Sequence, residues 1–448
     1  MNLEEIKGSI PRAVLKYSIP SIIAMILTSS ITIVDGLFIG NYIGKNAIAA
    51  VNLGLPIIYL FLAVGTMLGV GGSAIATRLL GSRKPDDSIA VFNQTILTTF
   101  ISLTVMSLIF LPSLVHISGF FIEDESVRLF FNKYYFIMLF AYPVMVLNTN
   151  FGMFVRAEGR PEAFMLITVI TIVINIFLDY MFIAVKDFGI PGIAYASLIS
   201  VLIGFFCLLI YFKCKSKVFK FRRCSFSKKV LVNTFLNGSS ELIGQLSMSI
   251  TMFALNYVIL RKVGVTGVAA FTIVGYVSYL FNMIVIGFGQ GASPIISYSF
   301  GANKHDLCKK VRNVTTAYIF LLGIVTLIVL NLLSDVYSNL FVKNGAVQNM
   351  VEAGIPIFSL AFLFMGFNII TSFYFTSIGK AKESAAISAS RGLVILLVCI
   401  FLFPVLWGMT GVWLIAPVTE LITIALSLLF ILKHDRAMKN SESCKYES

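Results

Sequence analysis

The sequence is poor in charge and in the residues that build catalytic and metal centres. Only 12% of its 448 residues are charged, three are histidine and two are tryptophan. The six cysteines form no Cys-x-x-Cys pair, so neither a zinc site nor a disulfide framework is expected. The sequence also lacks a glycine-rich phosphate loop ending in Lys-Ser or Lys-Thr, which argues against nucleotide hydrolysis. We therefore expect no enzyme activity, no cofactor and no resident metal.

Hydrophobic residues make up 58% of the chain, and the mean hydropathy of +0.92 lies far outside the range of soluble domains. Since a membrane-spanning helix needs about 20 apolar residues, the sequence predicts an all-α polytopic membrane protein. Twelve spans are expected, near residues 14–40, 47–77, 91–112, 130–155, 163–184, 190–212, 230–260, 267–298, 314–336, 351–375, 385–407 and 411–432.

The two halves of the chain repeat each other. Residues 49–95 recur at 269–315 with a constant shift of 220, and the shift later becomes 219. A fixed period of this kind marks an internal repeat. Six spans per half place both copies in the same orientation, so we expect two six-helix bundles related by a pseudo-two-fold axis along the membrane normal. Matching residues include Ala49/Ala269, Gly71/Gly291, Gly81/Gly301, Asn93/Asn313, Asn148/Asn368 and Gly192/Gly411.

The predicted organisation is an N-terminal bundle at 1–212, a basic linker at 213–229, a C-terminal bundle at 230–433 and a tail at 434–448. Positively charged loops resist translocation, so the linker, with eight Lys and Arg residues, is predicted to be cytoplasmic. Both termini then lie in the cytoplasm, and only seven of the 34 basic residues fall outside. This asymmetry accounts for the net charge of +13 without a nucleic-acid partner. Membrane lipid headgroups are the expected partners of the linker.

Four carboxylic acids lie within predicted spans, where a carboxylate costs about 2.5 to 3.5 kcal/mol even on a lenient insertion scale. The repeat supplies an internal control, because uncharged residues occupy the equivalent positions of the other half. The fold itself therefore does not require these acids. The pairs are Asp35 with Leu255, Asp179 with Val398 or Cys399, Glu241 with Ser21, and Glu420 with Val201 or a neighbour.

Two of these acids are expected to share one site. Asp35 and Asp179 each lie about five residues before the outer end of a span, roughly 7 to 8 Å below the boundary. Asn175 precedes Asp179 by one helical turn and shares its face. A buried carboxyl group can hold either a proton or a cation, so this trio is the candidate H⁺ or Na⁺ site. Other polar side chains that could line the same bundle are Tyr134, Tyr135, Asn148, Asn150 and Ser197.

The second bundle offers weaker candidates for cavity and substrate contacts. Glu241 lies near mid-bilayer with Gln245 one turn further on. Glu420 lies on the last span, where substrate contact and a structural hydrogen bond are equally good interpretations. Arg391 begins the eleventh span near the inner face, and we expect it to extend its guanidinium to the lipid headgroups.

Several motifs resemble those of the multidrug and toxic compound extrusion (MATE) family. They are Val34 to Gly40, Gly81 to Lys84, Arg156 to Pro161, and the Asn175 and Asp179 pair. The resemblance implies twelve helices around a central cleft, and efflux of cationic drugs or metabolites in exchange for H⁺ or Na⁺ across a bacterial plasma membrane. It also implies that Asp35, Asn175 and Asp179 bind the coupling ion, and that the acid of span seven assists. In span ten this chain carries no obvious acid, and Asn368 is among its few polar residues.

Two other functions fit the sequence less well. A lipid-linked oligosaccharide flippase would need several Lys or Arg residues inside the cavity to bind a pyrophosphate, whereas the mid-span regions here carry acids. A membrane-embedded enzyme or receptor lacks support, because the three histidines are scattered near span ends. A secondary antiporter acting as a monomer on cationic small molecules is the preferred hypothesis.

The predicted topology can be tested directly. A reporter protein fused after Lys217 is expected to be active only as a cytoplasmic reporter, because the basic linker should stay on the inner face. Paired fusions of alkaline phosphatase and green fluorescent protein measure this. Phosphatase activity at this junction would mean that the topology is inverted.

Overall fold

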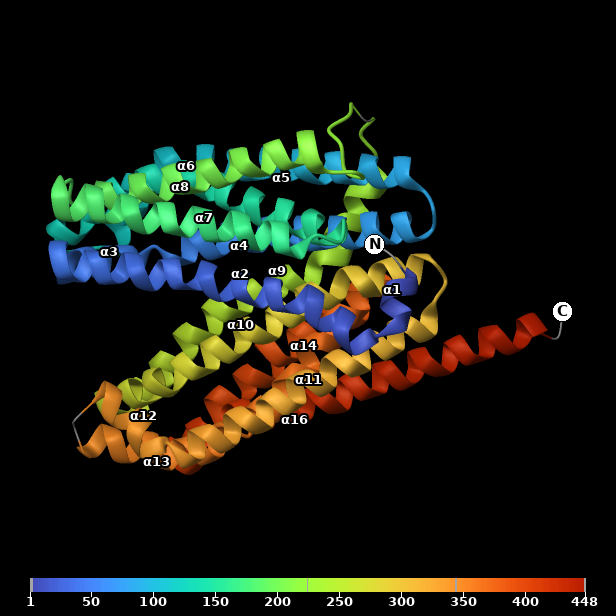
Figure 1. Cartoon of the computed structure of the whole chain (residues 1–448). Coiled ribbons are helices and arrows are strands. Elements are labelled where there is room, and N and C mark those ends of the chain that lie inside the picture. The colour runs from blue at the N-terminus through green and yellow to red at the C-terminus, as the bar shows by residue number, and fades with distance from the viewer. Residues whose placement is uncertain (1–2, 224, 343–344, 447–448) are drawn as a thin grey trace.

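The structure of the protein is a computed structural model that describes residues 3–223, 225–342 and 345–446. Positions 1–2 of the predicted first bundle, position 224 of the linker, positions 343–344 of the predicted second bundle and positions 447–448 of the tail lie outside these ranges. The described chain is helical and contains no strand within these ranges. The two halves form two lobes, and both described chain ends and the linker lie at the same end of the molecule (Figure 1). The predicted all-α, two-bundle fold is confirmed.

The described part of the N-terminal lobe contains six long helices, two short helices and three π-helical turns. The short helix α3 (Lys45–Leu53) is separated from α4 by Gly54, and π-helical turns continue α2, α7 and α8. The helices are α1 (Leu3–Gly8), α2 (Ile10–Phe38), α4 (Leu55–Gly81), α5 (Pro85–Phe121), α6 (Glu125–Ala157), α7 (Pro161–Asp179) and α8 (Ile190–Ile210), and the turns are η1 (Ile39–Ile43), η2 (Tyr180–Val185) and η3 (Tyr211–Lys215).

The C-terminal lobe has the same order of spans with more interruptions. The predicted tenth span is broken at Ser359 and Leu360, shortly after Pro356, into two helices. The last two spans form one continuous helical element with a kink at Trp407 and Gly408, where the backbone leaves helical geometry. The helices are α9 (Lys228–Lys262), α10 (Val265–Gly301), α11 (His305–Leu332), α12 (Ser334–Phe341), α13 (Gly345–Phe358), α14 (Ala361–Ile378), α15 (Ala381–Ala389) and α16 (Ile395–Tyr446), with the π turn η4 (Ser390–Val394) before α16.

The outer faces of the helices are apolar, as lipid contact requires. Eleven described helical segments are long and apolar enough to cross a membrane, and one of them, Ala381–Met438, contains the kink and so provides two crossings. Large apolar side chains such as Leu108, Val173 and Phe253 are more than half exposed. A water-soluble protein would bury these side chains, so the surface is typical of a multi-pass membrane protein.

Glycines that recur in the repeat bring the two lobes into backbone contact. A Cβ atom on Gly71 of α4 would collide with the carbonyl oxygen of Thr234 on α9, and one on Gly291 of α10 would collide with Ser18 on α2. Likewise, Gly81 abuts the backbone of α10, and Gly301 abuts the backbone of α4. Small residues allow helices to approach this closely in membranes. The repeat glycines therefore form a symmetric inter-lobe seam, composed of Gly71, Gly81, Gly291 and Gly301.

The linker between the lobes is held against the N-terminal lobe. Glu158 Oε1 accepts hydrogen bonds from Ser216 Oγ (2.6 Å) and from the backbone amides of Lys217 (2.7 Å) and Val218 (2.6 Å). Further along, Gln94 both donates to and accepts from the backbone of Ser227. The described residues between positions 216 and 227 therefore form a strap that is fastened to this lobe, and α9 begins directly after it.

Disturbing the seam should destabilise the observed arrangement of the lobes. Gly238 on α9 faces the seam beside Gly71, and in Gly238→Val the new side chain would collide with the backbone carbonyl of Met67 on α4. We expect a loss of about 1 to 3 kcal/mol, measured as a lower thermal unfolding midpoint of the purified protein. Gly244→Val is the matched control, because Gly244 lies on the same helix with no atom within 4 Å of an added Cβ. Equal destabilisation of both variants would refute a seam at Gly238.

Candidate functional site

Two acids from neighbouring helices meet near one end of the N-terminal lobe. Asp35 lies on α2 four residues before the π turn η1, and Asp179 is the last residue of α7 before the π turn η2. The helices α2 and α7 lie side by side, and the two carboxyl groups are within hydrogen-bonding reach of each other. The pairing inferred from equal depth in the membrane is present in the structure.

The pair is almost without donors. Asp179 is fully buried, and no N–H or O–H group of the described residues reaches either of its carboxyl oxygens. Asp35 is partly buried; its Oδ2 receives one long hydrogen bond of 3.5 Å from Ser197 Oγ on α8, and its Oδ1 has no donor among the described residues. Two ionised carboxylates in contact both accept hydrogen bonds and repel each other, and a proton or a cation between them would satisfy both.

Asn175 adds an unused amide to the same helix face. It is fully buried one turn before Asp179, and neither Oδ1 nor Nδ2 has a partner among the described residues. Buried polar atoms are nearly always hydrogen-bonded, and an unmade bond costs about 1 to 3 kcal/mol. The arrangement therefore offers up to five oxygen atoms from Asp35, Asp179 and Asn175, and oxygen atoms are the ligands that a proton or a hard cation prefers.

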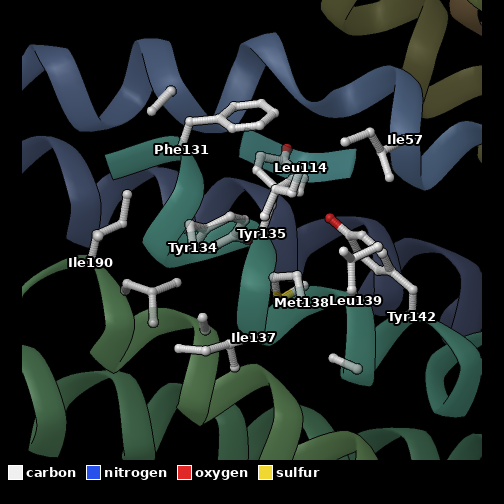
Figure 2. Close-up of a cluster of buried hydrophobic side chains, with 14 of the residues drawn as sticks. Ile57, Leu114, Phe131, Tyr134, Tyr135, Ile137, Met138, Leu139, Tyr142 and Ile190 are labelled. Carbon is white, nitrogen blue, oxygen red and sulfur yellow. The ribbon is translucent and has the colours of Figure 1, made fainter. Parts of the chain in front are cut away.

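The aromatic side chains of α6 form one wall of this region. Tyr134 is buried and lies near both Asp35 and Asp179. Tyr135, in contrast, points its hydroxyl at the backbone carbonyl of Val51 (2.6 Å), so it holds the α3 segment in place. Figure 2 shows both tyrosines among the apolar side chains of this lobe. Tyr134 is the better candidate for contact with a bound ion.

The structure does not bring the two asparagines of α6 to the acid pair. Asn148 Nδ2 donates to the carbonyl oxygen of Val201 (2.8 Å), and Asn150 Nδ2 donates to Gly65 O (3.0 Å) and to a neighbouring hydroxyl. Both lie at least 14 residues beyond Tyr134 on the same helix, which is about 20 Å along its axis. They tie α6 to the helices around it.

In the second lobe, two of the candidates are available for a ligand. Glu241 and Gln245 lie one turn apart on α9 and are partly buried. Neither side chain makes a hydrogen bond or ion pair with any residue that the structure describes. They are free to bind a ligand, but no second acid of the described residues lies with them, and no group of three or more potential metal ligands exists in the described chain.

Glu420 has a different environment. Its Oε1 accepts hydrogen bonds from Arg391 Nη2 (2.7 Å) and Nε (3.2 Å), and its Oε2 accepts from Asn368 Nδ2 (2.7 Å). The expectation that Arg391 extends to the lipid headgroups is wrong, because the guanidinium turns inward to this carboxylate. The sequence did contain a signal for this pairing. Arg391 and Glu420 are opposite charges on successive spans, and the equivalent positions of the first half are uncharged.

Comparison with known proteins agrees with this architecture. A model of the MatE family matches residues 20–181 and 242–402, one segment in each half of the chain. The multidrug export protein MepA of Staphylococcus saprophyticus is 24% identical over 438 residues, covering 96% of this chain and 95% of MepA. MepA of Staphylococcus aureus strain NCTC 8325 is also 24% identical, over 436 residues and the same shares of both chains.

Solved structures support the same fold. An outward-facing multidrug resistance MATE family transporter aligns with a TM-score of 0.90 at 23% identity, over 96% of this chain and 97% of that one. A transporter of the MOP superfamily from Pyrococcus furiosus aligns with a TM-score of 0.89 at 22% identity, over 96% of both chains. Since the segments that match the family model make up more than half of the sequence, this protein belongs to the MATE family of multi-pass membrane transporters.

Proposed function

We propose that this protein is a secondary active efflux antiporter that exports cationic or amphiphilic small molecules in exchange for H⁺ or Na⁺. One observation carries the proposal: Asp35, Asp179 and Asn175 gather buried oxygen atoms that have almost no donors among the described residues. The relatives named as multidrug export proteins support the export of drugs. A flippase of anionic lipid-linked sugars is less well supported, because the acids of this lobe would repel such a cargo.

The proposed cycle uses competition for the acid pair. When a proton or a sodium ion enters from outside, it balances one of the two negative charges of Asp35 and Asp179 and relieves their mutual repulsion. The helices α2 and α7 can then approach, which changes the inner surface of the lobe and favours release of the outbound cation. Rocking of the two lobes about their seam would expose the site alternately to each side of the membrane.

The same proposal includes the location and orientation of the protein in the membrane. A multi-pass monomer in the plasma membrane, with both termini and the linker in the cytoplasm, is the arrangement that the distribution of basic residues favours. Exposed basic residues of the strap, such as Lys217, Lys220 and Arg222, would then lie near anionic lipid headgroups.

The first variant tests export itself. Asp35→Asn is expected to reduce the efflux of a cationic dye such as ethidium to the background of cells that lack the protein, because the amide cannot exchange a proton or balance a cation. Dye efflux is measured in cells with equal amounts of each protein in the membrane. Glu123→Gln, which changes an exposed acid outside the spans, should retain normal efflux. Normal efflux by Asp35→Asn would reject the coupling role.

A second experiment identifies the coupling ion and tests the role of Asp179. In vesicles with an imposed pH or sodium gradient, dye transport by the unaltered protein should respond to one of the two gradients. Asp179→Asn is expected to lose most of this response, since the partner of Asp35 can no longer change its charge. A response of unaltered size would make Asp179 a structural acid only.

A further inference from the structure

The acid of the second lobe lies in a complete set of hydrogen bonds. Glu420 is only 5% exposed, and both of its carboxyl oxygens are occupied, by Arg391 on one side and Asn368 on the other. The remaining oxygen of Asn368 accepts a hydrogen bond from Ser427 Oγ (2.9 Å), which fixes the orientation of the amide. No oxygen atom of Glu420 or Asn368 is without a partner.

The first lobe presents the opposite case. There Asp179 and Asn175 are equally buried, but their polar atoms lack partners among the described residues. One lobe therefore holds acids that need a ligand, and the other holds an acid that already has a cation. The difference is one of chemistry rather than of burial.

The repeat identifies what has been added in the second lobe. Asn148 donates to the backbone carbonyl of Val201 (2.8 Å), and its equivalent Asn368 donates to the backbone carbonyl of Glu420 (2.9 Å). This shared contact aligns Glu420 with Val201. The equivalent of Arg391 in the first half is Thr171 or Ile172. Arg391 and Glu420 thus both occupy positions where the first lobe has uncharged residues. The second lobe differs from the first by the addition of both charges to the same helix packing.

The backbone around Arg391 fixes the direction of its side chain. Arg391 lies in the π turn η4, a rare geometry that is frequent at functional sites. The carbonyl of the next residue, Gly392, accepts a hydrogen bond from Thr251 Oγ1 on α9 (3.0 Å). A helix of the same lobe therefore anchors the turn that delivers the guanidinium to Glu420.

We propose that the Arg391 guanidinium is the resident cation of a carboxylate site in the second lobe, formed by Glu420 and Asn368. This inference rests on the proposed antiport function, because it explains why Glu420 takes no part in the ion exchange proposed for the acids of the first lobe. Arg391 acts through Glu420: its guanidinium occupies the position beside the carboxylate that a soluble cation would otherwise fill. Removal of its side chain converts the site into one for a small exogenous cation, either guanidinium or a hard monovalent ion.

The test measures binding by stability, without reference to transport. Purified Arg391→Ala is expected to unfold at a lower temperature than the unaltered protein, because Glu420 is left buried without a counter-charge. Addition of millimolar guanidinium chloride should raise the midpoint of Arg391→Ala by several degrees, and choline chloride at equal ionic strength should not. Sodium chloride serves as a second probe. The unaltered protein and Arg436→Ala, which changes an exposed arginine on the same helix as Glu420, should show no such rise.

A double variant keeps the proposal testable if Arg391→Ala folds poorly. Arg391→Met with Glu420→Met removes both charges and should be stable and insensitive to guanidinium. In vesicles it should retain the gradient response of the unaltered protein, since the acids of the first lobe are intact. Loss of that response with normal stability would show that Glu420 itself exchanges ions, and would overturn the proposal.

Two outcomes separate this inference from the proposed function. A guanidinium-dependent rise in stability for Arg391→Ala supports the resident cation even if Asp35→Asn transports normally, in which case only the antiport mechanism fails. Absence of any rise with guanidinium or sodium in a folded Arg391→Ala would refute the site, whatever the transport assays show.

Discussion

A charged side chain inside a membrane needs a counter-charge, a hydrogen-bonding partner or a mobile ion, because the hydrocarbon provides none of these. This constraint distinguishes the acids of the spans. Glu420 meets it with Arg391 and Asn368 from its own lobe. The charged group beside Asp179 is another carboxyl group, that of Asp35, and two like charges cannot meet the requirement. The proposed function therefore assigns the bound ion to the acid pair of the first lobe, where it would stabilise both carboxyl groups.

The repeat distinguishes the packing contacts that both lobes share from the charged residues that differ between them. The seam glycines, and the contacts of Asn148 and Asn368 with the neighbouring helix, occur in both lobes because both lobes use the same packing. The charged residues differ between the lobes, since Leu255, the equivalent of Asp35, lies in an apolar cluster that also contains Cys399. Asp179 aligns with either Cys399 or Val398, and both are uncharged. A duplicated frame with unequal charges allows the halves to differ in function, because one lobe can exchange an ion while the other keeps a constant charge.

Much of this could be predicted from sequence because depth in a membrane depends on position along the chain. The meeting of Asp35 and Asp179 followed from their equal distance to a span end, and the two bundles followed from the repeat. The direction of a side chain around its helix was harder to predict. Arg391 near a span end fits both a lipid-facing and an inward rotamer, and only packing against α16 decides between them. The hydroxyl of Tyr135 likewise donates to a backbone carbonyl that lies 84 residues away in the sequence, and such a long-range partner cannot be read from local sequence. The break of the tenth span after Pro356 depends on local packing.

The strap held by Glu158 and Gln94 has a mechanical consequence. A free segment from Ser216 to Ser227 could reach about 40 Å when extended and would let the halves of the protein drift apart. Because the strap is bound to the first lobe, it cannot extend in this way, and Ser227 caps the first turn of α9 directly. In the proposed cycle, rotation of the second lobe would be taken up at this junction, at the end of the molecule where both described chain ends lie (Figure 1). The far ends of the helices, including those beyond Asp35, travel the greatest distance for a given rotation.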